Sequence, residues 1–231
     1  MTTTLRSLVL LAIGVAGCGL VENEIKNLTT VDYAVPPQEM KEDFGAPAAG
    51  NLPMVACSGD ADCTKLPAVQ GATPSCSGGQ CILTVTVRTT IPVDLTKQGG
   101  FVAAVGNSPA VDHVDVKSVS YWAPTNTLTV DTPPVQVYVG PSTIKTETDP
   151  NATLLGTIPP LPRGQTVPMN QPMQMSLTPA GQAALSMLAK SFQTPLGLLA
   201  VAKVVVHGGQ PVPGGAIDLF VQPTLTFALI K

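Results

Sequence analysis

The stretch Ile217-Asp-Leu-Phe-Val-Gln-Pro-Thr-Leu-Thr-Phe-Ala-Leu229 decides the fold class of this chain. Most of its large apolar residues fall on odd positions, and Asp, Gln and Thr occupy even positions between them. Side chains of a β-strand alternate between two faces, so this pattern predicts a strand with one buried face. A slip of one residue would turn every side chain over, so the run also specifies its register.

The run before it, Leu196 to His207, is almost continuously apolar. Such a run is typical of a central strand that is buried on both faces. The residues between the two runs, 208–215, are rich in Gly and Pro, the residues that favour turns. We therefore expect a hairpin loop that joins the two strands.

Shorter alternating runs predict the other strands. With the two runs above they make about eight strands, the rest at residues 29–35, 82–88, 114–121, 128–130, 135–139 and 153–161. The alternation slips at Lys117-Ser118, which predicts a β-bulge, and the Pro-rich stretch 36–53 is expected to be loop. With 23 Pro and 21 Gly in the chain, the pattern predicts an all-β, two-sheet sandwich of immunoglobulin-like or jelly-roll-like type.

One segment, 178–193, has the features of a helix. Thr178-Pro179 is a good N-cap and first-turn pair, and apolar residues recur at helical spacing up to Phe192. Thr194-Pro195 ends the segment. We expect one helix that packs on an open end of the sheet.

The N-terminus predicts an exported and membrane-anchored protein. Residues 1–17 contain one Arg, no acid and a short apolar run, which is the organisation of a secretory signal peptide. The four residues Val15-Ala16-Gly17-Cys18 resemble the lipobox of bacterial lipoproteins. This resemblance implies lipidation of Cys18, with an acyl anchor in the membrane, residues 18–28 as a tether and 29–231 as the β-sandwich domain. Gly19 is not the Asp that retains many such lipoproteins at the inner membrane, so we expect the outer membrane of a diderm bacterium.

Four further cysteines, Cys57, Cys63, Cys76 and Cys81, lie in a short segment, 54–82, that we expect to be a cysteine-rich insertion in the domain. An even number of clustered cysteines in an exported chain indicates disulfides. Their spacing lacks the C-x2-C pairs that are typical of zinc sites, the alternative use. The segment resembles the small cysteine-rich segments of the Dickkopf N-terminal type, although it has fewer cysteines and implies no receptor.

Of the three possible pairings of these cysteines, we favour the crossed one. Cys57 would pair with Cys76 and Cys63 with Cys81, because this pairing ties the two arms of the segment together. Asp60 and Asp62 have the D-x-D spacing of calcium ligands, and the alternative is that they lie in a solvated turn.

Composition and motifs argue against several classes of function. Charged residues make up 12% of the chain and the net charge is −3, so we expect no nucleic-acid partner. His113 and His207 are the only histidines, and Asp112 and Asp115 beside His113 suggest a metal site only weakly. No catalytic motif is present, so we expect neither catalysis nor a cofactor. Tyr121 and Trp122 could contact a ligand if exposed, or else fill the core.

Three hypotheses of function follow. The first is a membrane-anchored envelope lipoprotein, without catalysis, whose sandwich is structural or binds an envelope protein. The second is a carrier or sensor of an apolar small molecule, because Met169, Met173 and Met175 precede a helix that could act as a lid. The third is a hydrolase, which requires His113 or His207 to lie in a concave site beside a Ser or Asp.

Overall fold

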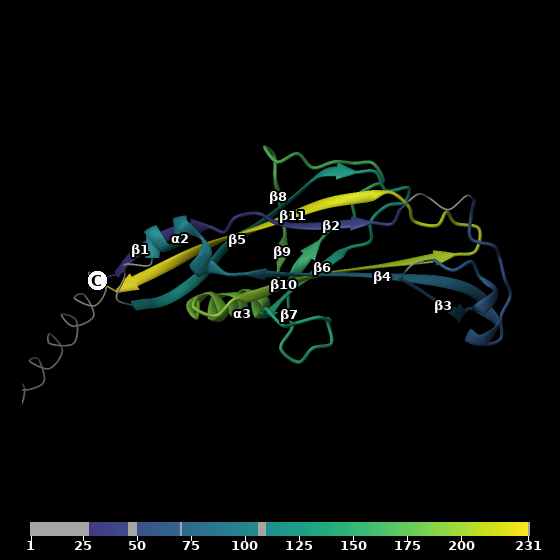
Figure 1. Cartoon of the computed structure of the whole chain (residues 1–231), viewed down its shortest axis with the longest axis horizontal. Helices are drawn as coiled ribbons and strands as arrows, with labels where there is room; N and C mark the ends of the chain where they lie inside the picture. Colours follow the sequence, from purple (N-terminus) through teal and green to yellow (C-terminus); the bar gives the residue numbers. More distant parts are fainter. Residues whose placement is uncertain (1–27, 46–49, 70, 106–109, 231) are drawn as a thin grey trace, which may run out of the picture.

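The computed structural model describes residues 28–45, 50–69, 71–105 and 110–230. In these residues, two antiparallel sheets pack face to face and form an elongated sandwich (Figure 1). This architecture confirms the all-β, two-sheet fold that the alternating runs predict.

The first sheet has five strands and is built around the stretch quoted above. Its strands are β1 (Leu28–Ala34), β2 (Gln38–Asp43), β5 (Ala110–Asn126), β8 (Met173–Gln174) and β11 (Ala216–Ile230). Strand β11 pairs with β5 along one edge, and β1 and β2 share its other edge. Of the odd residues that the pattern assigned to the core, Ile217 is half-buried, and the others are at most 5% exposed, namely Leu219, Val221, Leu225, Phe227 and Leu229. The predicted face is therefore confirmed from Leu219 onward.

The second sheet has six strands, in the order β3-β4-β10-β6-β7-β9. Their bounds are β3 (Ala72–Ser77), β4 (Gln80–Val93), β6 (Val135–Pro141), β7 (Thr153–Ile158), β9 (Ser176–Leu177) and β10 (Leu196–His207). Strand β10 lies between β4 and β6, as expected of a central strand. Its first six residues are buried, whereas residues 202–205 alternate between half-buried and exposed.

Strand β5 contains the predicted bulge. Ser118 pairs with Thr224 and Val116 with Leu225, so Lys117 is an extra residue opposite β11. The extra residue restores the apolar residues on both sides of it to the same face of the sheet, which is why the alternation in the sequence slips there.

Three expectations about connections are wrong. The loop 208–215 is not a hairpin, because β10 and β11 belong to different sheets and the loop crosses between them. Residues 36–53 are not all loop, since β2 pairs with the first half of β11. Residues 128–130 form no strand; Thr129 instead exchanges hydrogen bonds with the backbone of Gly214 in the crossover.

Helix α3 (Pro179–Lys190) lies within the predicted segment and closes one edge of the sandwich. The Thr178 hydroxyl accepts a hydrogen bond from the Gly181 N–H at 2.9 Å, as expected of an N-cap. The helix contacts β5 of the first sheet and β6 and β7 of the second. Just before it, β8 and β9 carry the chain from one sheet to the other.

A second helix, α2 (Gly99–Val105), was not predicted from the sequence; it follows the short helix η2 (Leu95–Lys97). Phe101 of α2 is 1% exposed. Its ring centroid lies 5.2–5.4 Å from those of Tyr33, Phe192 and Phe227. This aromatic cluster fills the main core at the end of the sandwich where β1 begins.

The cysteine segment packs at the opposite end of the sandwich (Figure 1). The helix η1 (Asp60–Lys65) carries Cys63 and the β3–β4 hairpin carries Cys76 and Cys81, whereas Cys57 lies in the stretch before η1. Their apolar residues form a small second core with residues of β4, β10 and the crossover, namely Leu52, Cys63, Leu66, Cys81, Leu83, Val206 and Val212. The segment therefore depends on the sandwich for its burial.

Candidate functional site

The predicted anchor and the predicted disulfides fall in different parts of the chain. Cys18, with the whole of 1–27, lies outside the described residues. The disulfides are Cys57–Cys76 and Cys63–Cys81, which is the crossed pairing that the sequence favours. The Sγ atoms of Cys57, Cys63 and Cys81 lie within 4.8 Å of one another. In disulfides these atoms are not the thiolates that zinc requires.

The two carboxylates of the cysteine segment hold its backbone. Asp62 accepts hydrogen bonds from the N–H and the hydroxyl of Ser58, at 2.8 and 2.9 Å, and from the Gly59 N–H. The bonds from Ser58 are the main reason that the pKa of Asp62 lies below its ordinary value. Asp60 accepts from the Cys76 N–H at 2.7 Å. These bonds favour the turn over the calcium alternative.

Tyr121 and Trp122 are core residues in the structure. Tyr121 is 0% and Trp122 4% exposed. The Trp122 ring stacks on Phe220 with centroids 5.5 Å apart, and the Tyr121 hydroxyl points at the Met173 sulfur. Neither side chain presents the exposed face on which a ligand could stack.

The histidines lie on the surface. His113 Nδ1 is 2.7 Å from the Asp112 carboxylate and Nε2 is 3.6 Å from that of Asp115. A second register shift, at Asp112, breaks the strand alternation that would otherwise put Asp112 and His113 on opposite faces. His207 lies at the exposed end of β10. Neither histidine lines the two hollows described next.

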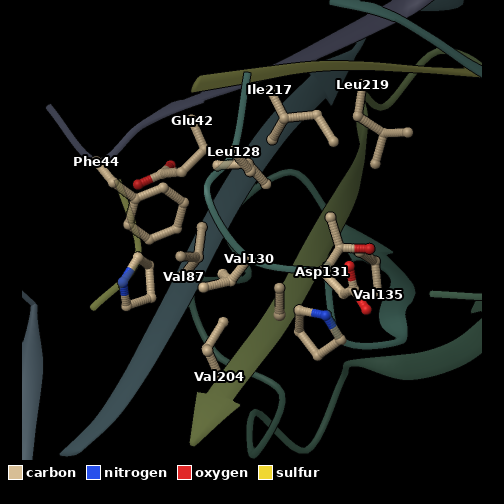
Figure 2. A pocket seen from close by; sticks show the side chains of 14 residues that line it. Glu42, Phe44, Val87, Leu128, Val130, Asp131, Val135, Val204, Ile217 and Leu219 are labelled. Carbon is tan, nitrogen blue, oxygen red and sulfur yellow. The ribbon is translucent and has the colours of Figure 1, made fainter. Parts of the chain in front are cut away.

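An apolar cavity of about 60 Å³ lies between the two sheets. Its walls come from β2, β4, β10 and β11 together with the loop before β6 and the first residue of that strand, Val135 (Figure 2). The lining residues are Glu42, Phe44, Val87, Leu128, Val130, Asp131, Thr132, Pro133, Val135, Ala202, Val204, Pro213, Ile217 and Leu219.

Few polar groups line this cavity. Asp131 accepts a hydrogen bond from the Arg163 N–H at 2.8 Å, and the Thr132 hydroxyl accepts one from the Leu161 N–H at 2.7 Å. The side chains of Asp131 and Thr132 thus link the loop before β6 to the loop after β7. Glu42 is half-buried, and burial, followed by the charge of Asp43, raises the pKa of its carboxyl above the ordinary value.

A wider and shallower cleft of about 470 Å³ adjoins the cavity. Val130, Asp131 and Val204 line both hollows, so the segment 130–131 separates them. The rest of the cleft is lined by Thr129, Arg163, Val205, Val206, Gln210 and Pro211. The cavity and the cleft together form the candidate site.

This site is not where the sequence suggested a ligand pocket. The expected lid, helix α3, contributes no residue to either hollow, and Met169 and Met173 are 70% and 45% exposed. The cavity instead combines the stretch 128–135 with one or two residues from each of several segments far apart in the chain, and no local pattern in the sequence marks them.

Comparisons with known proteins identify no relative: no family model, curated protein or solved structure matches the chain. Within the described part of the chain, no helix combines the length and the apolar character needed to cross a bilayer.

Proposed function

We propose that the chain is a lipid-anchored envelope protein without catalytic activity. Its sandwich is a rigid module that is structural or binds another envelope protein, held at the outer membrane through acylated Cys18. The observation that carries this proposal is the order of charge, apolar run, small residues and cysteine in Met1–Cys18. Two acyl chains would give a stable attachment, since each buried CH₂ contributes about 0.8 kcal/mol.

The cysteine segment supports an exported location. Two disulfides suit an oxidising compartment and are rare in the cytosol. One of them, Cys63–Cys81, belongs to the second core, where both residues are 0% exposed. A chain that stayed in a reducing compartment would lose a cross-link inside this core.

Metabolic labelling with a fatty acid tests the anchor. We expect the wild-type chain to take up label and to fractionate with membranes, and Cys18→Ser to do neither. Gly19→Asp is the matched control: it keeps the lipidated cysteine, and we expect it to retain the label and move to the inner membrane. Label in the Cys18→Ser protein would refute the anchor.

Crosslinking in cells followed by purification tests the binding role. The expected result is one reproducible protein partner for the anchored wild type. A chain that remains an uncrosslinked monomer would count against this role and favour a purely structural one.

The carrier of an apolar small molecule remains the second candidate. The apolar cavity between the sheets favours it, although the cavity is much smaller than the roughly 300–1,000 Å³ of ordinary ligand pockets. Extraction of the purified protein with organic solvent, followed by mass spectrometry, would detect a bound apolar molecule at a constant ratio to protein.

A further inference from the structure

We propose that the cleft binds an extended peptide segment of another protein, which pairs through its backbone with Val205 on the open edge of β10. This inference rests on the proposed binding role and not on the lipid anchor. The cleft has a volume of about 470 Å³, within the roughly 300–1,000 Å³ of ordinary ligand pockets. Unlike the cavity, it exposes polar as well as apolar atoms.

One edge of β10 is open where the cleft lies. The strand pairs with β4 from Leu196 to His207, whereas its pairing with β6 ends at Ala202. Beyond Ala202, no other strand of the described residues pairs with the edge that β6 leaves. Residues 204–206 line the cleft at this point, together with the segment 129–131 that precedes β6.

The chain before β6 turns away from this edge. Continuing the register of the β6–β10 pair would place Thr132 opposite Val205. Thr132 bonds instead to Leu161: its N–H donates to the Leu161 carbonyl at 2.9 Å, and its hydroxyl accepts from the Leu161 N–H at 2.7 Å. Pro133 and Pro134, which precede β6, have no N–H with which to extend the ladder. The path of a further strand beside Val205 is therefore open.

The β3–β4 hairpin determines which backbone groups of β10 point towards the cleft. Its turn has two residues, so the closing residues Ser77 and Gln80 bond to each other across the hairpin. Backbone groups alternate between the two edges of a strand, so the odd residues of β4 direct theirs towards β10. These odd residues pair with the even residues of β10. The odd residues of β10, Lys203, Val205 and His207, therefore direct their backbone groups away from β4.

Val205 has backbone groups that remain available on this edge. At His207, by contrast, the N–H donates to Gln210 Oε1 at 2.9 Å and the carbonyl accepts from the Gln210 N–H at 3.0 Å. Among the described residues, the N–H and C=O of Val205 have no hydrogen-bond partner. These two groups match the C=O and N–H of one residue of an antiparallel peptide. They therefore select an extended backbone over ligands that lack this pair of groups.

The side chains around this edge favour an apolar residue in the peptide. The side chain of Val205 belongs to a residue that is 40% exposed, and Val130 and Pro211 also line the cleft. Paired residues carry their side chains on the same face of a sheet, so a β-branched residue opposite Val205 would cover its exposed surface. Asp131 and Arg163 place one charge of each sign in the lining, so the walls favour no net charge of the peptide.

Hydrogen exchange of backbone amides tests the open edge. The full chain carries Cys18→Ser, which removes the lipid anchor, and keeps its disulfides. We expect the Val205 amide to exchange at least about ten-fold faster than the amides of Val204 and Val206, which bond to β4. Addition of acetyl-Thr-Val-Thr-amide at about nine times its Kd should slow the exchange of Val205 about ten-fold, because only the free protein exchanges.

Two methylated peptides form a matched pair. A methyl group on the nitrogen of the central Val removes the N–H that would donate to the Val205 carbonyl, and should weaken binding at least about ten-fold. The same group on the nitrogen of the following Thr removes an N–H that points away from β10, and should leave the affinity within about two-fold. Replacement of the central Val by Asn should weaken binding about three-fold, because the apolar cross-strand contact is lost.

Two variants locate the site on the protein. Val205→Pro removes the N–H of the open edge without removing a bond to β4, and proline is tolerated on strand edges. We expect this variant to fold and to bind at least about ten-fold more weakly. Val205→Thr keeps the N–H and the branched shape, and should bind like the parent protein. If Val205→Pro does not fold, the methylated peptides decide.

Equal affinity of the two methylated peptides, no shift of the Val205 amide signal with the parent peptide, or equally slow exchange of the three amides would overturn the proposal. Sedimentation of the protein alone tests a second copy as the occupant. A dimer that excess peptide dissociates would overturn the assignment to another protein. If the peptides do not bind but crosslinking gives a partner, this inference alone fails, and absence of label on Cys18 leaves it unaffected.

Discussion

At the scale of single residues, the best-defined polar contact on the outer face of the second sheet is Arg88 with Glu147. The Nε and one terminal nitrogen of Arg88 each donate to a Glu147 oxygen at 2.7 Å. Strand β4 is thereby tied to the loop that follows β6, where Thr90 also donates to the Ile144 carbonyl. The pKa of Glu147 is lowered to about 2, chiefly by the hydrogen bonds that its carboxylate accepts from Arg88.

This contact predicts a pH dependence of stability. The pKa of Glu147 falls from 4.5 to about 2 on folding, so the stabilisation is present above pH 4.5 and is lost as the pH falls towards 2. The side chains of Arg88 and Glu147 are 38% and 25% exposed, and solvent screening limits the contribution to about 1 kcal/mol or less. We expect Glu147→Gln to lower the unfolding free energy by that amount at pH 7.

Urea unfolding at pH 7 and at the lowest pH where the protein stays folded measures this difference. Glu39→Gln, which removes an exposed carboxylate from β2, is the control. A deficit in Glu147→Gln that stays the same at both pH values would contradict the linkage.

At the scale of elements, local pattern identified strands and faces but not partners. The burial of β11 and the bulge at Lys117 in β5 are visible in the sequence, because each depends on residues next to one another in the chain. Strand β2 was missed because it has one buried apolar residue, Met40, and forms by pairing with an edge of β11. The 208–215 crossover has the composition of a hairpin loop. It differs from a hairpin loop only in that the strands it joins, β10 and β11, belong to different sheets.

The candidate site could not be predicted from local sequence patterns either, because it also depends on which distant segments pack together. Disulfide partners could be favoured because the cysteines lie close together in the chain and few pairings exist. The cavity lies where the two sheets do not pack closely against each other. Its position therefore depends on how segments that are distant in the chain pack together. Glu42 in particular lies in a stretch expected to be loop, and only the pairing of β2 with β11 places it beside Ile217.

Helix α3 depends on a glycine at its contact with β7. A Cβ atom on Gly181 would lie 2.3 Å from Leu155 Cα and 2.4 Å from the Leu154 carbonyl oxygen, both parts of the backbone. Helix propensity alone favours Ala over Gly by about 1 kcal/mol. The clash opposes this gain, so we expect Gly181→Ala to destabilise the fold by about 1–3 kcal/mol.

Chemical denaturation measures the effect. Gly99→Ala in α2 is the matched control, because a Cβ there meets no atom within 4 Å, and it should be neutral or slightly stabilising. A Gly181→Ala protein more stable than the wild type would show that α3 can move away from β7 at little cost.

At the scale of the whole molecule, the start of β1 and the disulfides lie at opposite ends of the long axis (Figure 1). Strand β11 has 15 residues and alone spans about 50 Å. With the anchor proposed at Cys18, ten residues before β1, the cysteine segment becomes the end that is distant from the membrane.

This geometry predicts unequal access to lipid. A fluorophore introduced as an unnatural amino acid at Ile230 should be quenched by spin-labelled lipids when the lipidated protein is anchored in vesicles. The same fluorophore at Ser77, in the β3–β4 hairpin, should not be. Both positions are exposed, and equal quenching would show instead that the sandwich lies flat on the bilayer.

The pairing of the first and last strands also determines how the molecule responds to mechanical force. Leu28 pairs with Ile230, so the first residue of β1 and the last residue of β11 are neighbours on adjacent antiparallel strands. Tension applied between these ends opens the β1–β11 ladder like a zipper, one pair of hydrogen bonds after another, and such a sequence of breaks needs little force. Tension between β1 and the disulfides at the far end instead runs along the strands and, because β1 and the β3–β4 hairpin belong to different sheets, loads the packing between the two sheets. We therefore expect the sandwich to resist force applied along its length better than force applied between Leu28 and Ile230.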